Sequence, residues 1–148
     1  MSHLTTIKSK TKLSDREALI KALEKLGITY QVLDNPRKIT NFYGSNTDFF
    51  SDLIIPPELN KLYSEAAYVW NEEKQEYVLH CDSMDTSFIN RCKGIGLAYN
   101  QARVESTIQK MSQEKGEAEI NWINFEDGSA RAEVQFQGEL QTTNYGGL

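Results

Sequence analysis

Three consecutive residues, His80, Cys81 and Asp82, carry the side chains of this sequence best suited to chemistry. Imidazole, thiolate and carboxylate groups bind zinc, and they also act as nucleophiles or bases. Zinc sites need three or four ligands, commonly at short spacing, whereas Cys92 follows much later and His3 is the only other histidine. The run is therefore more typical of a half-buried strand than of a metal or nucleophile site. We expect no metal and no cofactor.

Two further patterns resemble ligand-binding motifs but are better explained by structural roles. Asp82 and Asp85 could share a divalent cation, but the glycine and distal glutamate of an EF-hand are missing, so loop and helix-cap roles are favoured. Gly94 and Gly96 have the spacing of a phosphate-binding loop. However, a dinucleotide fingerprint needs a third glycine and a P-loop needs Gly-Lys-Ser/Thr, and the sequence has neither here. No catalytic residue is predicted.

Residues 46–64 contain a cluster of large apolar side chains without helical or strand periodicity. We expect an insertion or capping segment, with a short helix beginning at Pro57. The apolar side chains either cap the core, which is favoured, or form a partner surface together with Tyr145 of the C-terminal tail. The apolar side chains are Phe49, Phe50, Leu53, Ile54 and Ile55.

Composition bounds the class of protein. The chain has 148 residues, a net charge of -5 and two cysteines. This size suits one domain, and two cysteines are too few for a disulfide framework. The acidic balance argues against a duplex-DNA binder. Because no apolar run could span a membrane and no signal peptide is evident, we expect a cytoplasmic or plastid-stromal protein without membrane insertion.

Two stretches have the apolar spacing of amphipathic helices. In residues 14–26, leucines recur every three or four positions, and Ser14 and Glu17 have the spacing of a capping box. Residues 87–115 follow the same period, but Gly94 and Gly96 should break or kink the first part. The long regular helix is therefore expected to begin near Leu97.

Shorter β-rich runs alternate with these helices. A turn is expected at residues 34–37, a hairpin around residues 71–75, and a further hairpin at Asp127-Gly128, a dipeptide typical of tight β-turns. The expected strands are residues 2–10, 28–33, 38–43, 65–70, 76–81, 119–125 and 130–136.

Together these elements predict an α+β two-layer sandwich, with a mainly antiparallel sheet of about six strands and two helices on one face. Residues 1–137 are expected to form a single domain. Residues 138–148 contain little to bury and are expected to form a flexible tail.

Four parts of the chain carry a family resemblance: the start at residues 1–8, the helix at 19–27, the hairpin with Trp70 and Tyr77, and residues 115–131. They resemble an uncharacterised conserved family of small proteins from cyanobacteria and algal plastid genomes, also seen in other bacteria and in phages. The resemblance implies a compact α+β domain in a cytosolic or stromal setting, and no assigned reaction. Residues 46–64 look longer and more apolar than the family pattern.

Three functions remain open. The first is a non-enzymatic accessory or adaptor protein that binds a protein partner through residues 46–64, a strand edge or the tail. The second is a small-ligand or metal-binding domain, with an enzymatic role open, centred on His80, Cys81 and Asp82. The third is RNA or single-strand binding, for which Tyr30, Phe42, Tyr43 and the early lysines would supply stacking and charge, against an acidic background.

Overall fold

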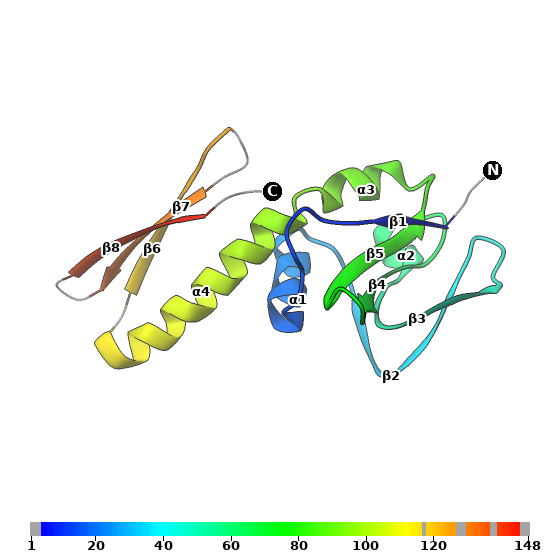
Figure 1. Cartoon of the computed structure of the whole chain (residues 1–148). Helices are drawn as coiled ribbons and strands as arrows, with labels where there is room; N and C mark the ends of the chain where they lie inside the picture. Colours follow the sequence, from blue (N-terminus) through cyan, green and yellow to red (C-terminus); the bar gives the residue numbers. More distant parts are fainter. Residues whose placement is uncertain (1–3, 117, 127–129, 137–138, 146–148) are drawn as a thin grey trace.

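The computed structural model describes residues 4–116, 118–126, 130–136 and 139–145. Helices and strands are interspersed along the chain (Figure 1). In order they are β1 (Leu4–Ile7), α1 (Arg16–Lys25), β2 (Gln31–Thr40), β3 (Asn46–Ile55), α2 (Pro57–Asn60), β4 (Ala66–Asn71), β5 (Glu76–Asp82), α3 (Thr86–Cys92), α4 (Ile95–Lys115), β6 (Ala118–Asn124), β7 (Ala130–Phe136) and β8 (Glu139–Tyr145).

The first five strands form one antiparallel sheet in the order β1-β5-β4-β3-β2. Its centre is the β4–β5 hairpin, in which Trp70 lies opposite Tyr77 and their rings meet edge to face at 4.9 Å. The predicted hairpin around residues 71–75 is therefore confirmed. The predicted α+β class is also confirmed, although the strands divide between two sheets.

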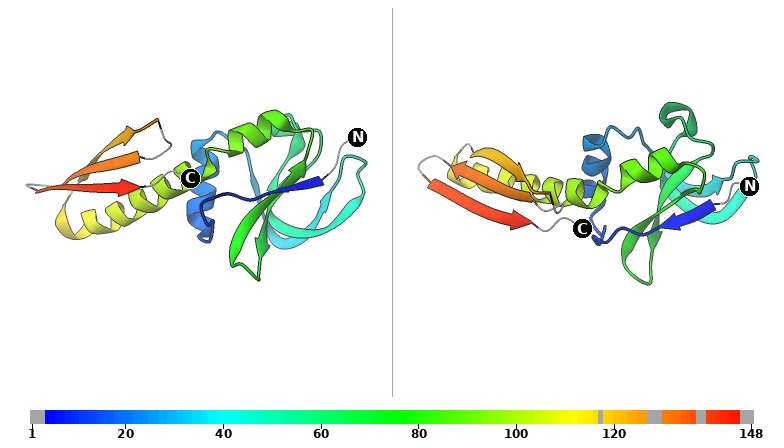
Figure 2. Two further views of the ribbon diagram at one scale, coloured as in Figure 1. Left: turned by 45° about the horizontal axis from the view of Figure 1, so that its top comes forward. Right: turned by 90° about the horizontal axis from the view of Figure 1, so that it is seen from above.

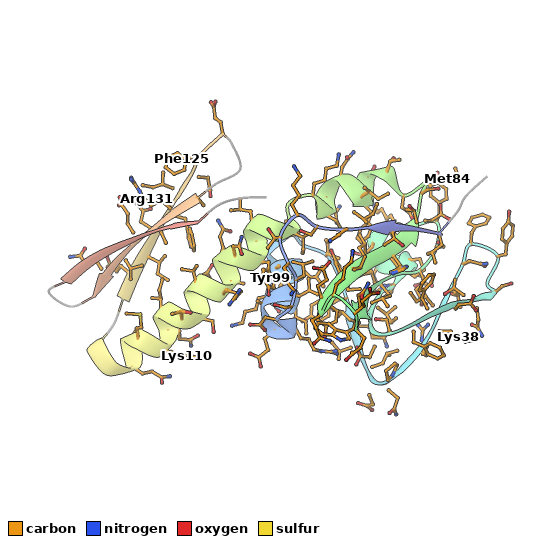
Figure 3. The ribbon with its side chains drawn as sticks, in the orientation of Figure 1. Lys38, Met84, Tyr99, Lys110, Phe125 and Arg131 are labelled. Atoms are coloured by element: carbon orange, nitrogen blue, oxygen red, sulfur yellow. The ribbon has the colours of Figure 1, made fainter. Side chains whose placement is uncertain are left out.

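α1 begins one residue later than a Ser14 cap would place it. Asp15 is the N-cap, and its Oδ1 accepts hydrogen bonds from the backbone N–H groups of Glu17 and Ala18. The N–H of Ser14 instead donates to the hydroxyl of Tyr99 at 3.2 Å, and the N–H of Asp15 donates to the same hydroxyl at 2.8 Å. Tyr99, on α4, thus fixes the start of α1 (Figure 3).

The helices cover one face of the five-stranded sheet. Side chains of α1, α3 and the first half of α4 share a core cluster with Leu53, Tyr68, Leu79 and Cys81 of the strands. Lys25 of α1 also forms an ion pair with a carboxylate on α4. Burial of this apolar surface provides the main stabilisation of the larger part of the molecule.

The turn predicted at residues 34–37 does not exist, because β2 continues through it. The pairing register between β2 and β3 shifts between Val32 and Arg37, and the strand changes direction there (Figure 1). β2 is an edge strand, so one of its sides has no neighbouring strand. Pro36 lacks a backbone N–H, and at an edge this does not remove a hydrogen bond between strands. The far half of the β2–β3 hairpin turns over the second face of the sheet, where Ile39 packs on Ile54.

Residues 46–55 form a strand and not an insertion. Leu53 and Ile55 belong to the cluster under the helices, while Ile54 belongs to the small cluster on the opposite face. β3 is therefore buried on both faces at this end. A strand of this kind has no polar and apolar alternation, which explains why its sequence lacks periodicity.

The helical residues after β5 are divided at Lys93 and Gly94 into α3 and α4, close to the predicted break. α4 leaves the five-stranded part and carries a second, three-stranded sheet (Figures 1 and 2). Side chains from β7 pack on Val104 and Ile108 of α4. None of the helices in the described ranges combines the length and hydrophobicity needed to cross a membrane.

The second sheet has the order β6-β7-β8. The pairing of β6 with β7 confirms the last predicted hairpin, whose turn residues 127–129 lie outside the described residues. Glu139–Tyr145, expected within a flexible tail, form β8 and pair with β7 along its length. β8 is held by its pairing with β7, which is a tertiary contact. The weakly apolar sequence of β8 therefore does not by itself predict a strand.

Candidate ligand-binding site

His80, Cys81 and Asp82 are consecutive residues of β5, so their side chains alternate between the two faces of the sheet. Cys81 belongs to the core under the helices. The His80 ring lies on the opposite face, where its centroid is 4.2 Å from that of Phe49 and its Nδ1 is 3.5 Å from Oγ1 of Thr6. The three side chains therefore do not converge on one ligand.

The electrostatic surroundings of these groups are those of a core. Burial lowers the pKa of His80 below its ordinary value, which favours the neutral form of the ring at neutral pH. Burial likewise raises the pKa of Cys81 to about 12 and that of Cys92 to about 11. Both thiols are consequently protonated at neutral pH and poor nucleophiles. Among the described residues, no three histidine, cysteine or carboxylate side chains are placed to hold a metal ion, and His3 lies outside these residues.

The apolar residues considered for a partner surface separate into two groups. Leu53, Ile54 and Ile55 are fully buried and belong to the core. Phe49 and Phe50 are exposed on the β2–β3 hairpin, by 40% and 55%. Tyr145 ends β8, and its side chain lies outside what the structure describes. Among those of these residues whose side chains are described, the two phenylalanines are thus accessible to a partner.

The residues considered for nucleic-acid stacking lie apart from the lysines. Phe42 and Tyr43 are exposed at the tip of the β2–β3 hairpin, where their rings meet edge to face. Tyr30 precedes β2, and its hydroxyl donates to a carboxylate of α1. The early lysines follow β1, which is the opposite edge strand of the sheet.

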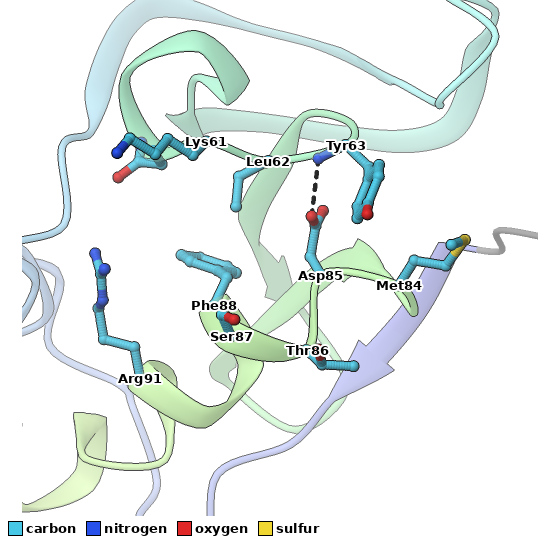
Figure 4. Close-up of a pocket in the computed structure, with 10 residues that line it drawn as sticks. Lys61, Leu62, Tyr63, Met84, Asp85, Thr86, Ser87, Phe88 and Arg91 are labelled. Atoms are coloured by element: carbon cyan, nitrogen blue, oxygen red, sulfur yellow. Dashed lines mark hydrogen bonds between the residues drawn. The ribbon is translucent and has the colours of Figure 1, made fainter.

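A different set of residues lines a pocket of about 460 Å³ between the α2–β4 connection and the β5–α3 connection. We call it the Asp85 pocket (Figure 4). Asp85, at its wall, is only 5% exposed. The backbone N–H of Tyr63 donates to Oδ1 of Asp85 at 2.8 Å, while Oδ2 is buried and has no hydrogen-bond partner among the described residues.

The carboxyl group of Asp85 is difficult to ionise. Burial raises its pKa, the backbone N–H groups of Tyr63 and Ser64 oppose this shift, and the nearby carboxylate of Asp82 adds to it. A buried carboxylate oxygen without a donor is costly, by about 1–3 kcal/mol. Oδ2 of Asp85 is therefore an acceptor with capacity for a further donor.

Two cationic side chains lie at the other end of the Asp85 pocket. Lys61 caps the C-terminus of α2 in a left-handed backbone conformation, with φ of 57°, and Arg91 extends from the last turn of α3. Leu62 and Phe88 lie between these cations and Asp85 (Figure 4). Neither cation has an ion-pair partner among the described residues. The pocket thus has an acidic end, an apolar middle and a basic end.

Local sequence patterns carry only a partial signal for this site. Asp85 was expected to cap a helix, and it does occupy the N-cap position of α3, but its side chain makes no capping hydrogen bond there. It bonds to the N–H of Tyr63 from a distant segment, a tertiary contact with no local signature. Lys61 and Arg91 have no distinguishing sequence signal, because exposed basic residues near helix ends are common.

Comparisons with protein-family models, with curated proteins and with solved structures found no match for this chain.

Proposed function

We propose that this protein is a non-enzymatic accessory protein that binds a small zwitterion in the Asp85 pocket. The ligand's ammonium group, or an equivalent donor, bonds Asp85, and its anionic group bonds Arg91 and Lys61. The single observation that carries the proposal is the buried, unpartnered Oδ2 of Asp85 at the pocket wall. Two buried free thiols further favour a reducing compartment such as the cytoplasm or the plastid stroma.

Support for a ligand with two opposite charges comes from the order of side chains along the pocket. An ammonium group placed at Asp85 supplies the missing donor and favours the ionised form of the carboxyl. A carboxylate or phosphate at the other end meets a guanidinium, which can bond it in a bidentate manner. Leu62 and Phe88 then contact the apolar linker between the two charges. A ligand with one charge leaves one end unpaired.

The experiment uses ω-amino acids as molecular rulers. Glycine, β-alanine, γ-aminobutyrate and ε-aminocaproate separate an ammonium from a carboxylate by increasing distances. Each is titrated into the protein with heteronuclear NMR as the readout, and butylamine and butyrate serve as controls with one charge. We expect one length to bind best and to shift amides of residues 61–63 and 85–91. Equal binding of the zwitterions and the controls contradicts the proposal.

Matched substitutions locate the site. Asp85→Asn and Arg91→Gln should each weaken the best zwitterion by at least about tenfold, since a charge-assisted hydrogen bond contributes about 1.5–3 kcal/mol. Asp48→Asn makes the same chemical change in an exposed carboxylate that does not line the pocket, and Lys74→Gln is the control for loss of a positive charge. The two control variants should bind normally.

The adaptor function is a second candidate, favoured by the exposed aromatic side chains of the β2–β3 hairpin. Phe42, Tyr43 and Phe50 are exposed by 50%, 72% and 55%. Aromatic residues are common anchors in protein interfaces. The test is affinity purification of the tagged chain from its source cells, with nucleic acid also measured. A protein partner lost with Phe42→Ser/Tyr43→Ser but kept with Leu59→Ser supports this function; retention by both variants, or recovery of RNA alone, contradicts it.

A further inference from the structure

A second cavity, of about 400 Å³, lies between the segment after β1 and the start of α4. No residue that lines it also lines the Asp85 pocket. Its wall is mainly apolar and includes Ile7, Leu13, Leu79 and Ile95. Cavities of about 300–1,000 Å³ with apolar walls and a few polar groups are typical small-molecule sites. We call it the Tyr68 cavity.

One polar group in this wall is weakly satisfied. Tyr68 is only 1% exposed, and its hydroxyl has no hydrogen bond of good geometry among the described residues, although the Cys92 thiol, a weak acceptor, interacts with it. Burial raises the pKa of this hydroxyl well above its ordinary value, so it remains protonated and offers a donor. An apolar residue would fill the core at no such cost, and a buried tyrosine hydroxyl normally finds a partner. This hydroxyl therefore contributes little to the choice of ligand, which depends on the apolar wall and on the charge around the cavity.

Positive charge surrounds the Tyr68 cavity, although the whole chain has a net charge of -5. Three lysines line it, and no carboxylate does. Lys8 is partly neutralised, since its Nζ lies 3.6 Å from Oε1 of Glu76. Lys10 and Lys93 are exposed and have no ion-pair partner among the described residues.

The start of α4 adds to this positive potential. Ile95, the first residue of this 21-residue helix, lines the cavity. No side chain caps the helix, and no acidic residue occupies its first turn. The N-terminal N–H groups of a helix attract anions, and here the first residue of α4 lines the same cavity as Lys10 and Lys93.

We infer that the Tyr68 cavity binds a small anionic amphiphile, with its apolar body inside the cavity and its anionic head between Lys10, Lys93 and the start of α4. The apolar wall selects the body, and the lysines select the charge. This site is independent of the Asp85 pocket, and either can fail without the other.

The test is calorimetric titration with hexanoate, octanoate and decanoate below their micelle concentrations. Affinity should rise about fourfold for each added methylene, the equivalent of about 0.8 kcal/mol, and should stop rising once the cavity is full. Octan-1-ol and octylammonium test the role of charge, and both should bind at least about tenfold more weakly than octanoate. If affinity keeps rising with chain length and reaches no plateau, the ligands adsorb to the surface, and the inference is overturned.

Variants that reverse the charge of two lysines test where the anionic head of the ligand binds. Lys10→Glu/Lys93→Glu should weaken octanoate by at least about tenfold. The matched control Lys12→Glu/Lys110→Glu makes the same change of net charge at exposed lysines that do not line the cavity. All four positions are exposed, so both variants should fold, which circular dichroism checks. Equal affinities for octanoate in the two variants overturn the inference.

Discussion

The hydroxyls of Tyr68 and Tyr99 are both buried, but they differ in their hydrogen bonds. The Tyr99 hydroxyl accepts from two backbone N–H groups, whereas the Tyr68 hydroxyl has only a weak interaction with the Cys92 thiol. Tyr99→Phe should therefore lower the free energy of unfolding by about 1–3 kcal/mol, because two donors at the start of α1 lose their acceptor. Tyr68→Phe should change it by less than about 1 kcal/mol, because a thiol is a weak acceptor. Urea unfolding measures both, and equal losses contradict the difference in bonding.

The raised pKa of Asp85 predicts a dependence of stability on pH. In the folded protein this carboxyl still binds its proton at pH values just above 3.8, its ordinary pKa, where the unfolded chain has released it. The contribution of Asp85 to stability therefore falls as pH rises through this interval. Asp85→Asn does not titrate, so its stability relative to the unmodified protein should increase as pH rises from 4 to 7. Urea unfolding across this range measures the difference, and a constant difference refutes the prediction.

At the level of elements, Arg37 holds the bent strand β2 against the sheet. Its guanidinium forms two hydrogen bonds of 2.7 Å with the carboxylate of Glu65, which directly precedes β4 and also accepts from the N–H of Thr40. Burial works against ionisation of Glu65, but these bonds outweigh it and lower the pKa of Glu65. This ion pair joins two segments that the bend in β2 brings together.

Arg37→Ala should cost about 2–3 kcal/mol of unfolding free energy, because it leaves the buried Glu65 carboxylate without its cation. Arg37 itself is partly exposed, which places the expected loss below that of a fully buried pair. Lys38→Ala, next to it in β2, is the control and should cost less than about 0.5 kcal/mol. Thermal and urea unfolding measure both, and equal small effects would mean that the pair contributes little.

The elements predicted well from sequence were those with local signals. The stripe in α1, the β4–β5 hairpin and the break at Gly94 each depend on neighbouring residues, and the structure contains all three. β2 continues through Pro36 because this strand lies at the edge of the sheet. No local sequence pattern indicates that edge position. Leu53, Ile54 and Ile55 were hard to interpret because both faces of β3 are buried.

The candidate site was less predictable than the fold. Asp85 was recognised as a polar residue of a loop or cap, but its partner is the backbone of Tyr63, and its burial depends on packing around α2 and α3. Sequence favours groups of catalytic residue types, such as His80 and Cys81, but alternation along a strand sends these two to opposite faces. A single carboxylate gains its chemistry from surroundings that only the folded chain provides.

The whole molecule contains two main cores joined by α4. The larger lies between the five-stranded sheet and the helices, and the smaller joins the second half of α4 to β6 and β7. The two clusters share no residue. Stability need not be uniform across such a molecule, and the smaller core should open more readily.

Val134→Asp places a charge in the smaller core, at a site where Val134 is 3% exposed, and should greatly destabilise the second sheet. Hydrogen exchange followed by NMR should show lost protection in β6 and β7 but unchanged protection in β4 and β5. Gln135→Asp introduces the same charge at an exposed position of β7 and should have little effect. Parallel loss of protection in both sheets would show that the molecule unfolds as one cooperative unit.

The position of α4 along the chain also affects how the protein is made. Every residue of the larger core cluster precedes Val104, so that core can assemble as soon as the ribosome has released the first half of α4. The second half then emerges with Val104 and Ile108 uncovered until β7 has been translated. During this interval the nascent chain presents an apolar stripe on a helix, a target for chaperones that a finished molecule no longer displays.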